Sequence, residues 1–333
     1  MKKLDFTAPF CGFMILEFIN CFSAVYAHLE SIQENQEQFF FLFDTMCGRS
    51  AVRYRFDGEP TGPAKRIGVT DEDNRGTNDT MDFLFGFAGY AYRKITDAAA
   101  FKDEIITAID AGKPVIAKVK AGKGRFRVIT GYDGKKLIEP SYNESLRWHK
   151  EPKKATKHGD IEALIIVGDK IQPRYTLIDG LRRIVEVMEY NSREKPWESW
   201  IEQFTYFPPT HIKNFYEVDN KEKQARMKKL GDIMWTMDGY SFQNAFNNHN
   251  LYEELQNPAL TALKIGDPYG QNFDLYYSLI GLAECADWKK HSFSGGFVGE
   301  IAVLALRKIQ ENEEAVLETV KQAIAILEQG GHP

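Results

Sequence analysis

The chain is poor in cysteine, and its cysteines show no spacing that would build a disulfide framework or a metal site. The 333 residues contain four, at Cys11, Cys21, Cys47 and Cys285. No two of them form a CxxC pair, and none has the spacing of metal ligands. Free thiols are typical of a reducing compartment, so we predict a cytoplasmic protein.

A long apolar run is also lacking. Met1 and two lysines precede an apolar stretch that ends Ala24-Val-Tyr-Ala27, which superficially resembles a signal peptide with a small-x-small cleavage site. Asp5, Glu17 and Asn20 interrupt that stretch. Nothing else in the chain approaches the roughly 20 apolar residues needed to span a bilayer. We therefore expect no membrane partner.

Neither charge sign is in large excess. The 42 lysines and arginines are outnumbered by 47 acidic residues, and the formal net charge is −5. Basic clusters at residues 150–157 and 221–229 are interleaved with acids or lie in a polar segment. Such clusters are usually solvated faces, so we expect no nucleic-acid partner.

Cofactor motifs are missing as well. The sequence contains no Walker A loop, no GxSxG elbow, no dinucleotide fingerprint and no HExxH pair. We predict no cofactor and no bound metal.

The sequence does contain two halves of different texture, and the chain is long enough for two domains. Residues 1–172 mix helical and β-rich patterns, whereas residues 173–333 show apolar residues at three- and four-residue intervals. We predict an α+β domain over 1–172 and an all-α helical domain over 173–333. In the second half, helices are expected over residues 177–190, 197–207, 221–237, 275–288 and 297–329. The tryptophans and tyrosines of these helices are expected in the core.

Within the first half, apolar spacing predicts helices over residues 20–32, 37–46 and 98–110. Short β-rich runs separated by glycine-bearing turns predict antiparallel strands. These strands are expected over residues 115–119, 128–132, 136–138 and 161–167.

Cys21 is the strongest candidate for chemistry. Asn20 is a suitable N-cap for the helix predicted to follow it, which places Cys21 in the first turn. A thiol there lies at the positive end of the helix dipole, which favours the thiolate. The unpaired backbone N–H groups of that turn are also suited to stabilise an oxyanion. The alternative is that Cys21 is a small buried hydrophobic residue, as free cysteines often are.

Three sequence blocks carry a resemblance to a known family. They are residues 20–29, residues 43–53, and the strand-rich segment from residue 112 to Pro140. Together they resemble C39-type papain-like cysteine peptidases, and more closely the N-terminal domain of the butirosin biosynthesis protein H family. The resemblance covers the first half of the chain and implies a papain-like domain, with a central helix packed on an antiparallel sheet.

The resemblance also implies a thiol acyl-enzyme mechanism. By position Cys21 is the nucleophile, Arg125 stands where the base histidine belongs, and Glu139 replaces the orienting aspartate. Arginine stays protonated and does not accept the thiol proton. Arg125 is suited instead to pair with a thiolate, with an anionic substrate group, or with Glu139 in a bidentate contact. His149 and His158 are candidates for a substitute base.

Two functions follow from these observations. The first is a thiol hydrolase or acyltransferase that acts through Cys21, aided by Asn20, Arg125 and Glu139, on a peptide, an amide or a thioester. The second is a non-catalytic papain-fold protein that binds a peptide or an acidic small molecule.

Overall fold

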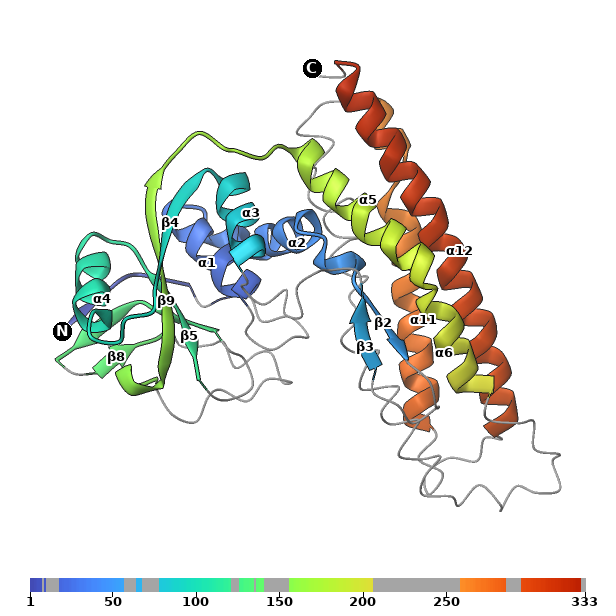
Figure 1. The fold of residues 1–333 in the computed structure, drawn as a ribbon, viewed down its shortest axis with the longest axis horizontal. Coiled ribbons are helices and arrows are strands. Elements are labelled where there is room, and N and C mark those ends of the chain that lie inside the picture. Colours follow the sequence, from blue (N-terminus) through green and yellow to red (C-terminus); the bar gives the residue numbers. More distant parts are fainter. Residues whose placement is uncertain are drawn as a thin grey trace. The chain divides into compact units, whose positions relative to one another are not determined.

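The computed structural model divides the chain into two compact units, which are described separately (Figure 1). The first comprises Met1–Cys47 and Asp73–Thr176, and the second Gly48–Glu72 and Leu177–Pro333. The structure describes residues 1–7, 9, 18–56, 64–67, 78–120, 126–134, 136–140, 156–205, 258–285 and 295–330.

The first unit is an α+β structure around a four-stranded antiparallel sheet, as predicted for the fold class. The strand order is β4 (Tyr90–Ile95), β9 (Ile161–Lys170), β5 (Val115–Val119) and β6 (Phe126–Ile129). Val115 is paired with Ile166 on one side and with Ile129 on the other. The sheet thus joins segments that are distant in sequence, with β9 inserted between β4 and β5.

A second, three-stranded sheet contains β1 (Lys2–Lys3), β7 (Gly131–Asp133) and β8 (Lys136–Ile138). The predicted strand over residues 128–132 is therefore two strands that belong to different sheets. At Gly131 a Cβ atom would overlap the carbonyl oxygen of Lys2. Glycine at this position allows β1 to pair closely with β7.

Helices cover both faces of the four-stranded sheet (Figure 1). On one face α1 (Phe18–Leu29) packs on β5 and β6, and the Phe18 ring lies 5.5 Å from that of Phe126. On the other face α4 (Phe101–Asp110) contacts β5 and β9. Because both faces are covered, β6 is buried along its whole length. This burial explains why the strand sequences are mostly continuous apolar runs.

The described part of the first unit contains further helices, all of them later in the sequence than α1. They are η1 (Gln33–Asn35), α2 (Gln36–Met46), α3 (Asn78–Ala88) and η3 (His158–Asp160). The positions of α2 and α4 agree with the sequence prediction to within three residues at each end. The segment that forms α3 and β4 had no predicted element.

The second unit is mainly helical. It contains α5 (Leu177–Glu194), α6 (Pro196–Thr205), α10 (Pro258–Ala262), α11 (Gly266–Cys285) and α12 (Gly295–Glu328). The 34-residue helix α12 packs against α5, α6 and α11. The helix predicted over residues 221–237 lies outside the described residues. None of the helices that the structure describes is both long and apolar enough to cross a membrane.

The second unit is not purely helical, because it takes up a segment that we assigned to the first half. This segment contains η2 (Arg49–Ala51) and the hairpin of β2 (Arg53–Phe56) and β3 (Ala64–Ile67). The physical reason is that β2 packs on α6, with the Phe56 ring 4.9 Å from Trp200. Trp197 and Trp200 are both buried, as expected for core residues.

Candidate functional site

The predicted nucleophile, Cys21, is the fourth residue of the described part of α1. The described part of α1 begins at Phe18, so Asn20 is an internal helical residue and not the predicted N-cap. Phe18 and Ile19 extend the helix because both are fully buried, and Phe18 packs on Phe22 and Phe126. Cys21 is therefore at the limit of the four residues whose N–H groups are free at a helix start.

Burial of the thiol is complete. The exposed fraction is 0% for Cys21 and 1% for Asn20, and residues 18–25 are all buried. Reactive cysteines lie in partly exposed, electropositive surroundings, whereas buried ones in apolar surroundings are inert. The aromatic rings of Phe18, Phe22 and Phe85 are in mutual contact on this helix face. Cys21 therefore occupies the position of a core residue.

Glu139, the candidate orienting acid, is engaged by two other groups. Its Oε1 accepts a hydrogen bond from the Thr156 backbone amide at 2.8 Å, and its Oε2 lies 3.8 Å from Nε of Arg127. Arg127 is itself buried and donates to the carbonyl oxygen of Phe126 at 2.8 Å. The carboxylate thus balances a buried guanidinium and joins the end of β8 to the segment before η3.

Arg127 and Phe126 point to opposite faces of the sheet, because side chains alternate along a strand. Phe126 contacts Phe18 of α1, whereas Ile129, two residues after Arg127, belongs to the core beneath α4. Arg127 and its partner Glu139 therefore lie on the face away from α1. Arg125 lies outside the described residues, so its predicted contact with Glu139 stays a prediction.

Two of the seven histidines, His28 and His158, lie in the described residues. His28 is seven residues farther along α1, about 10 Å along the helix axis. Its Nε2 lies 3.4 Å from the carbonyl oxygen of Gly112. His158 lies in η3, where burial and the nearby Lys102 lower its pKa. His149 lies outside the described residues.

Among the other cysteines, the structure describes the side chain of Cys47. Cys47 is a buried thiol whose Sγ donates to the carbonyl oxygen of Asp44 at 3.4 Å. Cys11 lies outside the described residues. Within the described ranges, no three histidine, cysteine, aspartate or glutamate side chains are grouped as a metal site would require.

A second polar centre lies in the helical unit, where sequence reasoning expected only core. The fully buried Arg53 of β2 donates from Nε to Oε1 of Glu313 at 2.6 Å. It also donates to the carbonyl oxygens of Ser50 and Val52 at 2.9 and 2.8 Å. Trp197 donates its indole N–H to the other oxygen of Glu313 at 2.7 Å, and Arg53 lies 5.9 Å from the centre of its ring. These contacts fix the orientation of the Glu313 carboxylate.

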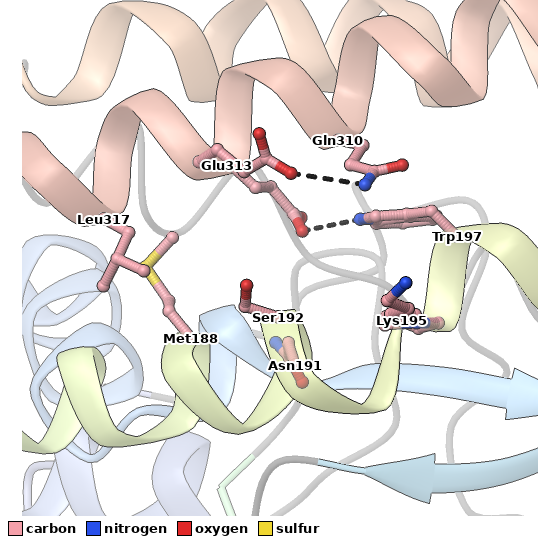
Figure 2. Close-up of a pocket in the computed structure, with 10 residues that line it drawn as sticks. Met188, Asn191, Ser192, Lys195, Trp197, Gln310, Glu313 and Leu317 are labelled. Carbon is pink, nitrogen blue, oxygen red and sulfur yellow. Dashed lines mark hydrogen bonds between the residues drawn. The ribbon is translucent and has the colours of Figure 1, made fainter.

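A pocket opens beside Glu313 (Figure 2). About 430 Å³ of empty space lies within and in front of it, open solvent included. Its residues come from the C-terminal half of α5, the start of α6 and the middle of α12: Met188, Asn191, Ser192, Lys195, Pro196, Trp197, Gln310, Glu313, Glu314 and Leu317. Sequence reasoning missed this pocket because Arg53 and Glu313 are 260 residues apart. The only sequence signal is a tryptophan at the start of a predicted helix.

No family model, curated protein or solved structure matches the chain.

Proposed function

We propose that the first unit is a non-catalytic papain-like domain that binds a peptide or an acidic small molecule through Arg125. The observation that carries this proposal is the complete burial of the Cys21 side chain within α1. An acyl-enzyme mechanism needs a thiolate that a carbonyl carbon can reach, together with a base within hydrogen-bond distance.

The arrangement of elements supports the papain-like assignment. A buried helix, α1, packs on an antiparallel sheet, and its cysteine lies in the first half of that helix. The sequence places arginine where a papain-like enzyme has its base. Arginine is a permanent cation with a planar set of donors, which suits the binding of carboxylates.

Glu139 supports binding over catalysis for a separate reason. A catalytic orienting acid has to direct a base, but this carboxylate is already bonded to the Thr156 amide and faces Arg127. Its role in the proposal is structural. It holds the end of β8 and the segment before η3 together, next to the strand that follows Arg125.

Ligand-observed NMR with acetyl-aspartate as the probe tests the proposal. We expect binding to be lost in Arg125→Gln and retained in Cys21→Ala. Arg93→Gln is the matched control, because this exposed arginine pairs with Glu104 on the same unit. Binding that survives Arg125→Gln, or no binding to the natural chain, would contradict the proposal.

The competing function is a thiol hydrolase or acyltransferase that uses Cys21. Its signature is turnover of a peptide thioester that disappears in Cys21→Ala. Arg125→His supplies the base that the family pattern contains. Turnover gained in that variant would indicate a domain derived from an enzyme, whereas turnover by the natural chain would overturn the non-catalytic assignment.

A further inference from the structure

Buried residues recur every seven positions along α12. Residues seven apart lie on nearly the same face of a helix. One such row contains Leu306, Glu313, Val320 and Leu327, and another contains Ala302, Ile309, Val316 and Ala323. The neighbouring segment that ends in α11 has a buried row with the same spacing: Ile265, Asn272 and Leu279. A slip of α11 by seven residues would therefore present a similar row to α12, so apolar contact alone separates the two registers poorly.

A pair of buried amides interrupts this pattern where α11 and α12 lie side by side (Figure 1). Asn272 is 0% exposed and Asn312 is 5% exposed. Asn312 donates its Nδ2 to Oδ1 of Asn272 at 2.8 Å, and Asn272 donates its own Nδ2 to the carbonyl oxygen of Ile309 at 3.5 Å. Within residues 300–328 of α12, the buried side chains are apolar except for Asn312 and Glu313. The two polar side chains thus stand at one level of a long apolar helix.

Asn312 and Glu313 hold α12 to different neighbours. Glu313 is bonded to Arg53 of β2 and to Trp197 of α6, whereas Asn312 is bonded to α11. Among the described helices and strands, α12 is the principal neighbour of α11. The position of α11 therefore depends on its contact with α12.

A slipped register would separate the two amides. A shift of α11 by seven residues brings Ile265 or Leu279 to the level of Asn312, and neither side chain has a hydrogen-bonding group. Buried amides that lose their partners are costly enough to disfavour the slipped register by at least about tenfold. Single buried asparagines specify the register of paired helices in this way.

We propose that the Asn272–Asn312 pair is a register lock, which selects one axial position of α11 on α12 among positions that apolar packing makes similar in free energy. The pair aligns the two helices more than it stabilises them. This inference concerns the second unit and does not depend on the function proposed for the first.

Double electron–electron resonance between two spin labels measures this alignment. The labels are attached at Asp274→Cys on α11 and Glu300→Cys on α12, both of which are exposed positions. Cys11 and Cys285 are replaced by serine so that only the labelled sites react, since Cys21 and Cys47 are buried. A slip of seven residues moves one helix along the other by about 10 Å, which changes the distance between the labels measurably. With the natural amide pair we expect one distance.

The decisive variant combines Asn272→Leu with Leu279→Asn, which moves the amide seven residues along α11 and keeps the composition. We expect α11 to slip by seven residues, so that the moved amide again bonds Asn312 and a new label distance replaces the natural one. An unchanged distance in this variant would show that other contacts set the register, and the proposal would be overturned.

A second variant combines Asn272→Leu with Asn312→Leu, and it should fold because it leaves neither amide without its partner. We expect a second distance beside the natural one, in at least about 10% of the molecules. Asn191→Leu is the matched control, because this buried amide of the same unit bonds the carbonyl oxygen of Ala51 and not α11. It should keep a single distance. A single natural distance in the double variant, or a second distance in the control, would also overturn the proposal.

Discussion

Replacing Glu313 by glutamine should destabilise the helical unit strongly, because it removes a charged partner from a buried guanidinium. Arg53 has an exposed fraction of 0%, and its Nε is 2.6 Å from the Glu313 carboxylate. Breaking a buried ion pair by removing one partner costs about 3–5 kcal/mol. The carbonyl oxygens of Ser50 and Val52 still accept from Arg53. These contacts place the expected loss near the lower end, at about 3 kcal/mol.

Urea unfolding followed by tryptophan fluorescence measures this loss. With a denaturant slope of about 2–3 kcal/mol/M, the midpoint should fall by roughly 1–1.5 M. Glu314→Gln is the control, because it removes an adjacent exposed carboxylate and should change stability by less than about 0.5 kcal/mol. Arg53→Met combined with Glu313→Leu should cost less than Glu313→Gln alone, since no unpaired charge remains. A loss below about 1 kcal/mol for Glu313→Gln would refute the reasoning.

Three further changes test other parts of the structure. Glu139→Ala should cost about 2 kcal/mol, because it removes the acceptor of the Thr156 amide and unbalances a buried arginine, and chemical denaturation measures this. Asn312→Leu should cost about 1–3 kcal/mol, because Asn312 donates to Oδ1 of the buried Asn272 at 2.8 Å. The variant that combines Asn312→Leu with Asn272→Leu should recover part of that loss, and a double-mutant cycle measures the recovery. Hydrogen bonds from Lys170 and Tyr90 lower the pKa of Glu30 below 4.5, so its contribution should be present above pH 4.5 and lost as the pH falls further. Glu30→Gln should therefore flatten the acid limb of a stability–pH curve, and an unchanged limb would contradict the assigned contacts.

Sequence reasoning predicted the elements whose own residues show a regular apolar spacing or a short apolar run. Helices α2 and α4 were found because their apolar residues recur at helical spacing, and the β5 strand because it is a short apolar run bounded by turns. The start of α1 was misplaced because Asn20 has the residue type of a cap. Tertiary packing of Phe18 on Phe126 instead extends the helix past it.

Long-range pairing accounts for the features that sequence reasoning missed. The break between β6 and β7 depends on β1, whose lysines pair with Tyr132 and Gly131. The transfer of residues 48–72 to the helical unit depends on Arg53, whose partner is 260 residues away. Neither contact leaves a periodic signal in the sequence. The burial of Cys21 was one of two alternatives from the sequence, because the periodicity of α1 does not separate a core thiol from one at a helix start.

The most direct test of the non-catalytic assignment is the rate at which iodoacetamide alkylates Cys21 near neutral pH, read by peptide mass spectrometry. Cys47 is the internal control, since it is a second buried thiol on the same unit. The account predicts that both thiols react only after urea unfolds the chain. Alkylation of native Cys21 at or above the rate of the unfolded chain, while Cys47 stays protected, would contradict it.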